Sequence, residues 1–219
     1  MKILIFGATG LAGGGVLRAC LAAPMVDEVC AIARRPVGRK HNNLRVFNHD
    51  DFLNYSGVSA AFTGIDACLF CLGVSVMQVS GEGEYRRITH DFTLAAAQEL
   101  KKNSPRAVFH YISGQGTSLD SRFMWARVKA QTEQELIKMI NSVGWRPAFI
   151  GGVASPGSPR LFKILQPVLK LLKPFSSFYV EGQDLGRAMI QATIENIYGR
   201  TIENAEIRKI AGRYGSLSR

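Results

Sequence analysis

The sequence predicts an α/β protein with a doubly wound parallel sheet, in which helices cover both faces of the sheet. Apolar runs alternate with amphipathic, helix-like segments in regular order along the 219 residues. Each run is apolar at successive positions, which is typical of strands buried on both faces. The first run leads into a glycine-rich turn and then a helical pattern, a strand–turn–helix order that suits the start of such a sheet.

Each element follows from its own pattern. Strands are predicted at residues 2–6, 29–33, 44–47, 67–72, 107–112 and 145–150. Helical patterns lie near residues 13–22, 56–62, 83–101 and 124–141. Because no linker, repeat or low-complexity stretch divides the chain, we expect a single domain over residues 1–219.

The glycine-rich turn after the first strand carries the strongest functional signal. Gly7, Gly10 and Gly13 are spaced three apart. Such a turn lets the backbone approach phosphates, and the following helix offers free N–H groups. We therefore expect a dinucleotide pyrophosphate to be held by Gly7, Thr9, Gly10, Leu11, Ala12 and Gly13. A turn without a cofactor is the alternative; a secretory signal is disfavoured because glycines and Arg18 interrupt the apolar run.

Composition limits the class of protein. The chain is 47% hydrophobic and 20% charged, and no apolar run approaches the length of a membrane span. We therefore expect a soluble, cytoplasmic protein without membrane insertion. The net charge of +10 favours an anionic ligand or an acidic partner. Nucleic-acid binding is not expected, because no nucleic-acid-binding motif is present.

The four cysteines are expected to be core thiols. Cys68 and Cys71 have C-x-x-C spacing, but positions three apart on a strand point to opposite faces. A redox pair is the alternative, although neither cysteine starts a helix that would lower its pKa. The sequence contains no Cys/His cluster that would predict a metal site.

The end of the second strand indicates which dinucleotide is bound. Arg34 and Arg35 stand where an acidic residue would hold the ribose hydroxyls of NAD(H). Arginine accommodates a 2′-phosphate, so NADP(H) is expected in preference to NAD(H). A solvated charge run is the alternative. Asp51 after the third strand is expected to bond the adenine amine, and Gly73 after the fourth to lie close to the adenosine ribose.

Residues 151–180 are expected to form a small lid over the substrate. A Gly/Ser/Pro-rich loop is followed at 160–173 by apolar residues at helical spacing with interspersed lysines. A packed helix with solvated lysines is favoured over a helix lying on a membrane surface.

Five segments together resemble a known superfamily. They are the Gly-x-x-Gly-x-x-Gly turn, Asp51-Phe52, Leu72-Gly73, Ile112-Ser113-Gly114 and the helix bearing Lys129. The chain looks like an atypical short-chain dehydrogenase/reductase, nearest the NmrA-like and Tat-interacting-protein-like NAD(P)-binding branches, over residues 1 to about 195. The resemblance implies a Rossmann fold, and residues 184–189 are similar to the start of a C-terminal helix in extended members.

The resemblance also implies an active site from which this chain departs. Typical members carry Tyr-x-x-x-Lys on a helix, where the lysine lowers the pKa of the phenol and holds the ribose. The matching positions are Trp125 and Lys129, and Ser113 matches the serine that orients the substrate. An exposed Lys129 paired with Glu133 is the alternative. Tyr85 is a candidate replacement for the missing proton donor.

Two functions follow from these motifs. The first is an NADP(H)-dependent reductase of a small carbonyl, quinone or imine substrate. The second is a non-catalytic NADP(H)-binding regulator, in which the redox state of the cofactor changes affinity for a protein partner.

Overall fold

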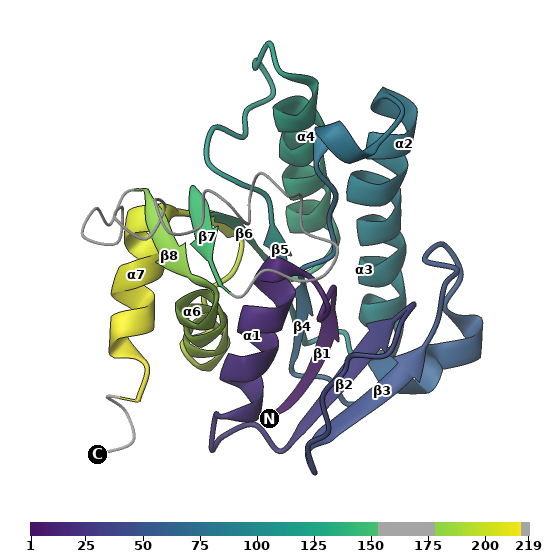
Figure 1. Cartoon of the computed structure of the whole chain (residues 1–219), viewed down its shortest axis with the longest axis vertical. Coiled ribbons are helices and arrows are strands. Elements are labelled where there is room, and N and C mark those ends of the chain that lie inside the picture. Colours follow the sequence, from purple (N-terminus) through teal and green to yellow (C-terminus); the bar gives the residue numbers. More distant parts are fainter. Residues whose placement is uncertain (153–177, 216–219) are drawn as a thin grey trace.

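A seven-stranded parallel sheet forms the centre of the protein. The computed structural model describes residues 1–152 and 178–215 (Figure 1). The sheet has the order β3-β2-β1-β4-β5-β6-β9, and every neighbouring pair is parallel. Its strands are β1 (Lys2–Phe6), β2 (Glu28–Ala33), β3 (Leu44–Asn48), β4 (Ala67–Phe70), β5 (Val108–Ile112), β6 (Ser142–Arg146) and β9 (Arg200–Glu203). The strand order reverses between β1 and β4, where such sheets leave a crevice beyond the strand ends.

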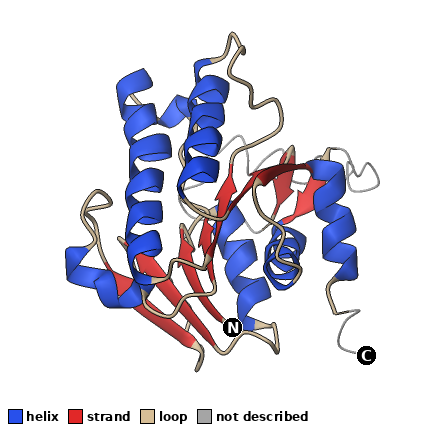
Figure 2. Cartoon of the chain, turned by 180° about the vertical axis from the view of Figure 1, so that it is seen from behind, coloured by secondary structure: helices blue, strands red, loops and turns tan. Residues whose placement is uncertain are grey.

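Helices cover both faces of the sheet, so the doubly wound prediction is confirmed (Figures 1 and 2). One face carries α1 (Leu11–Leu21), α6 (Gly182–Ile194) and α7 (Asn204–Arg213). The other carries α2 (Glu82–Arg86), α3 (Phe92–Asn103) and α4 (Met124–Met139). Shorter helical turns are η1 (Ser56–Phe62), η2 (Val76–Gln78) and the π-helical turn η3 (Arg87–Asp91).

Alternating strand residues divide between two apolar clusters. In β1, Ile3 and Ile5 join the cluster under α1 and α6, whereas Leu4 and Phe6 join the cluster under α3. Cys68 and Cys71 likewise lie on opposite sides of the sheet. All four cysteines are free, and burial raises the pKa of each thiol. Cys20, Cys30 and Cys68 are buried, so the prediction of core thiols is confirmed for these three, whereas Cys71 is half-buried and lines a cleft.

The strand predicted at 145–150 is wrong in its extent. The chain instead forms β6, breaks at Pro147, and continues as β7 (Phe149–Gly151). Strand β7 pairs with β8 (Tyr179–Glu181) in a separate two-stranded parallel sheet. Proline has no N–H for a sheet ladder, so the chain changes sheets there.

The helix predicted at 83–101 is present as a continuous helical segment over residues 82–103 that contains a π-helical turn. It consists of α2, the π turn η3 and α3. The π turn inserts one residue into the helical ladder, and apolar spacing alone does not reveal such an insertion. The 56–62 segment is a 3₁₀ helix rather than an α-helix.

Two segments complete the description. Helix α6 begins at Gly182, in agreement with the resemblance noted at 184–189, and β9 adds an edge strand that the sequence pattern did not reveal. The predicted lid at 151–180, with its basic segment at 160–173, lies outside the described residues except at its two ends. No helix in the described ranges is long and apolar enough to cross a membrane.

Candidate functional site: an arginine-lined cleft

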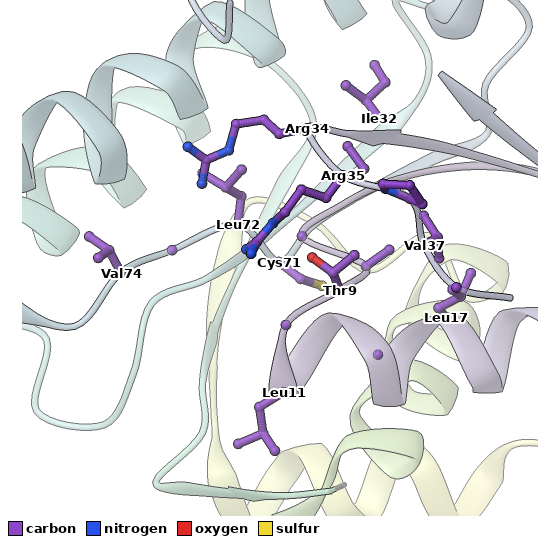
Figure 3. A pocket seen from close by; sticks show the side chains of 18 of the residues that line it. Thr9, Leu11, Leu17, Ile32, Arg34, Arg35, Val37, Cys71, Leu72 and Val74 are labelled. Atoms are coloured by element: carbon purple, nitrogen blue, oxygen red, sulfur yellow. The ribbon is translucent and has the colours of Figure 1, made fainter. Parts of the chain in front are cut away.

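A cleft of about 810 Å³ opens beyond the carboxyl ends of β1, β2 and β4, at the point where the strand order reverses (Figure 3). Four segments supply most of its walls: the glycine turn with α1, the loop after β2, the loop after β4, and the η3–α3 junction. The lining residues include Gly7, Thr9, Gly10, Leu11, Gly14, Arg18, Arg34, Arg35, Val37, Arg39, Phe52, Leu72, Gly73, Ile88 and Phe92.

The glycine turn is shaped by close backbone contacts. Gly7 has a φ of +70°, and a Cβ there would lie 2.5 Å from the carbonyl oxygen of Cys71 on β4. A Cβ on Gly13 would lie 2.1 Å from the carbonyl oxygen of Gly7. Both glycines are therefore required for the strand, the turn and α1 to pack together.

The start of α1 faces the cleft without a side-chain cap. Gly10 is the N-cap residue and is exposed, and no side chain bonds the first turn. The first N–H groups of a helix have no helical carbonyl to bond, and they carry a partial positive charge. Gly10 and Leu11 line the cleft, whereas Ala12 and the buried Gly13 do not. The turn can receive an anionic group at its mouth.

Four arginines line the cleft, from α1 and from the loop after β2. They are Arg18, Arg34, Arg35 and Arg39, and no Asp or Glu is among the described lining residues. None of the four guanidinium groups forms an ion pair or hydrogen bond with any residue that the structure describes. Figure 3 shows Arg34 and Arg35 extending from the end of β2 toward the side of the cleft where Leu72 lies. The cleft is therefore strongly electropositive.

The cleft lining also includes apolar side chains. Four of them, Phe52, Leu72, Ile88 and Phe92, offer contacts to a flat apolar ring, and they are called the apolar wall. The sequence reasoning missed Ile88 and Phe92, because their spacing of four resembles the core-facing side of a helix. Gly73 lines the cleft beside Leu72, and its closeness to a ribose stays a prediction.

Asp51 has a different environment from the one expected. It does not line the cleft, and its Oδ1 accepts a hydrogen bond from the backbone N–H of Leu53 at 3.2 Å. Phe52 lines the cleft in its place. The contact of Asp51 with an adenine amine stays a prediction.

Ser113, at the end of β5, directs its hydroxyl into the interior. The side chain is 3% exposed, and Oγ donates to Oε1 of Glu133 at 2.5 Å. Glu133, itself 4% exposed, pairs with Arg146 at 2.7 Å, and Arg146 also contacts Glu203 at 3.1 Å. The sequence reasoning named Glu133 only as a neighbour of Lys129. In the structure Glu133, on α4, contacts the end of β5 through Ser113 and the end of β6 through Arg146. Arg146 in turn contacts Glu203 at the end of β9.

Lys129 lies beside the same strand end. Its Nζ donates a hydrogen bond to the backbone carbonyl of Ser113. Burial lowers the pKa of Lys129 to about 8, although the charge of Glu133 opposes the shift. The alternative of an exposed lysine paired with Glu133 does not describe this arrangement, because Glu133 takes Arg146 as its ion-pair partner.

Trp125 and Tyr85 are both packed side chains. The Trp125 ring stacks on Phe123 with centroids 6.4 Å apart, and it lies over Gly116. Tyr85 is 2% exposed, and burial raises the pKa of its phenol. Ser113, Trp125 and Lys129 are thus grouped around the β5–α4 connection, and none of them lines the cleft.

Known proteins of similar sequence match this chain over only part of its length. No protein-family model matches the chain. The chain is 28% identical over 141 residues to "Protein FMP52, mitochondrial" of Saccharomyces cerevisiae, and the match covers 64% of this chain and 60% of that protein. Proteins of the same name from Eremothecium gossypii and Candida albicans are also similar. The chain spans about three fifths of the length of these relatives.

Solved structures show the fold class. The reductase domain of PhqB from Penicillium fellutanum superposes with a TM-score of 0.68 at 18% identity, over 92% of this chain and 65% of that domain's chain. The enzyme WbmH of Bordetella bronchiseptica, solved in complex with NAD+, superposes with a TM-score of 0.70 at 20% identity, over 96% and 79% of the two chains. The chain therefore has a Rossmann-like α/β fold.

The comparison also corrects one expectation. The cytoplasmic location is wrong, because the similar FMP52 proteins are named as mitochondrial. That expectation rested on composition and on apolar-run length, and neither property distinguishes the cytoplasm from the interior of an organelle.

Proposed function

We propose that this chain binds NADP(H) in the arginine-lined cleft. The observation that carries the proposal is the set of four arginines without a carboxylate among the described lining residues. The diphosphate and the 2′-phosphate of NADP(H) supply several negative charges, and Arg34 and Arg35 stand where a 2′-phosphate binds in such folds. The glycine turn would receive the diphosphate, and the apolar wall with Phe52 and Phe92 would receive the adenine.

Replacement of Arg34 tests this assignment. Arg34→Ala is expected to weaken NADPH binding by about tenfold or more, because an ionic hydrogen bond contributes about 1.5–3 kcal/mol. NADH has no 2′-phosphate, so its affinity is expected to change little. Isothermal calorimetry measures both affinities, and Arg106→Ala, at an exposed position before β5, controls for the loss of one positive charge. Equal weakening of both nucleotides would contradict the proposal.

The reaction that fits this site is reduction of a small carbonyl, quinone or imine compound by an atypical short-chain dehydrogenase/reductase of the NmrA-like or Tat-interacting-protein-like branch. The nicotinamide, when bound, supplies the hydride. Lys129, on α4 beside the end of β5, would hold the ribose hydroxyls. The Trp125 indole donates a hydrogen bond but does not exchange its proton near neutral pH. Loss of the phenol therefore costs about 10²–10⁴-fold in rate.

A direct assay tests the reductase. NADPH oxidation is followed with aldehydes, ketones and quinones for the wild type and for Trp125→Tyr. Trp125→Tyr is expected to be the faster of the two, because it restores a phenol four residues before Lys129. If both proteins bind NADPH and neither oxidises it with any acceptor, the reductase is excluded for these substrate classes.

A non-catalytic regulator that binds a protein partner is the second candidate. It is favoured by the engagement of the Ser113 hydroxyl with buried Glu133, which leaves that hydroxyl facing away from a substrate. A sensor must bind NADP+ and NADPH with different affinities, because a ligand shifts an equilibrium only by its differential affinity. Calorimetry with each form tests this requirement, and equal affinities would exclude the sensor.

A further inference from the structure

Among the described lining residues, Arg18 is the arginine that a helix supplies. It lies in the last turn of α1 and is half-buried. A Cβ built on Gly14, one helical turn earlier, would lie 4.0 Å from Nη1 of Arg18. The side chain therefore runs back along α1 toward the glycine turn.

This direction is the ordinary one for a long side chain on a helix, which points back over the preceding turn. A basic residue near a helix C-terminus is stabilised when its charge lies close to the last carbonyls. The guanidinium of Arg18 instead points toward the positive end of α1. The missing side chain at Gly14 leaves room for it along the cleft wall.

The loop after β2 packs against α1 and contributes a second arginine to the cleft lining. Val37 packs against the apolar cluster that contains Leu17 of α1, and Figure 3 shows the two side chains next to each other. This contact holds the loop against α1, and Arg39 follows two residues later in the cleft lining. The cleft lining thus receives Arg18 from α1 and Arg39 from the loop that packs on α1.

These charges lack a compensating anion within the described part of the chain. Arg18 and Arg39 form no ion pair there, and the described lining contains no acidic residue. Guanidinium groups gathered in one cleft repel each other, and a phosphate with several oxygens can accept hydrogen bonds from more than one of them. A phosphate monoester is the anionic group of NADP(H) left for these arginines, because the diphosphate is expected at the glycine turn.

We propose that Arg18 is a specificity-determining residue that contacts the ribose phosphate of NADP(H) from the α1 wall of the cleft, which it lines together with Arg34 and Arg39. This inference rests on the proposed NADP(H) site. On this inference, a residue of α1 as well as residues at the end of β2 determine the preference for NADP(H) over NAD(H).

Binding measurements on Arg18 variants test the inference. Arg18→Gln removes the charge with little change in size, and Arg18→Lys keeps the charge but removes the planar pair of donors. Arg106→Gln is the matched control, because Arg106 is exposed and precedes β5 at the opposite end of the sheet. The ligands are NADPH, NADH, adenosine 2′,5′-bisphosphate and 5′-AMP, titrated by calorimetry after thermal melting has shown that each variant is folded.

Arg18→Gln is expected to weaken NADPH and adenosine 2′,5′-bisphosphate by about tenfold or more, as for the loss of one ionic hydrogen bond. NADH and 5′-AMP are expected to change less than about twofold, and Arg18→Lys is expected to retain an intermediate affinity. Arg106→Gln is expected to match the wild type.

Other results separate the two proposals. If the wild type prefers NADPH and Arg18→Gln behaves like Arg106→Gln, the role of Arg18 is overturned and the NADP(H) site stands. If Arg18→Gln weakens all four ligands equally, Arg18 serves the shared 5′-phosphate and the assignment to the ribose phosphate is overturned. If the wild type binds NADPH and NADH equally or not at all, the proposed NADP(H) preference fails, and this inference fails with it.

Discussion

At the scale of single residues, the glycines of the first turn have different physical roles. Gly7 adopts a left-handed conformation and lies against the backbone of Cys71. Gly13 allows α1 to approach the turn. A Cβ on Gly14 would make only ordinary contacts, at 3.5 Å from the carbonyl oxygen of Ala8 and 4.0 Å from Nη1 of Arg18. The spacing of three in the sequence identifies the turn, but only the packing separates glycines that are required from one that is not.

The neighbouring pair Gly13 and Gly14 gives a direct stability test. Gly13→Ala is expected to lower the free energy of unfolding by about 1–3 kcal/mol or more, because its methyl group would overlap the Gly7 carbonyl. Gly14→Ala is expected to be neutral or stabilising by about 0.5–1 kcal/mol, because alanine favours a helix interior. Urea denaturation measures both values. Equal losses at the two positions would contradict the packing described for the turn.

At the scale of elements, a buried histidine joins two strands to a helix. The Trp145 Nε1–H donates to Nδ1 of His110 at 3.0 Å, so Nε2 carries the proton and donates to Oγ1 of Thr193 at 2.9 Å. These contacts connect β5, β6 and α6. Burial lowers the pKa of His110 to about 3, so the folded protein keeps this ring neutral.

This burial predicts a dependence of stability on pH. An unfolded histidine has a pKa of about 6.5 and takes up a proton below it, whereas folded His110 does not. The contribution of neutral His110 is therefore complete above pH ~6.5 and is lost as pH falls toward its folded pKa, by up to about 1.4 kcal/mol per pH unit. His110→Asn is expected to flatten the fall in unfolding free energy between about pH 6.5 and 5. The exposed His41→Asn serves as control, and parallel slopes for the two variants would contradict this account.

The sequence predicts elements well where a pattern is local. Buried strands are apolar throughout and the long helices are amphipathic, so β1, β2 and α4 could be located. The break after β6 depends on a single residue, Pro147, and the π turn at Arg87–Asp91 adds a single residue to a helix. An apolar pattern does not reveal changes of this size. The bond from Ser113 to Glu133 depends on a contact across 20 residues, and no spacing rule predicts that a carboxylate will be buried beside it.

At the scale of the whole molecule, distant segments assemble one electropositive cleft. Arg34 and the glycine turn could be assigned from sequence, because strand ends of a parallel sheet meet at one edge. Arg18, Ile88 and Phe92 could not, because each lies on a helix face whose neighbours are fixed only by folding. The net charge of the chain is +10, and the cleft is also positive. The four guanidinium groups in its described lining show where part of that charge lies.

Hydrogen–deuterium exchange with and without NADPH tests the central claim most directly. NADPH is expected to slow exchange at residues 8–14, 34–39 and 72–78, the backbone segments around the cleft, while residues 56–66 remain unchanged. NADH at the same concentration is expected to protect these segments less, with the largest deficit at 34–39. Protection by NADPH elsewhere in the chain without protection of these three segments would contradict an NADP(H) site in the arginine-lined cleft.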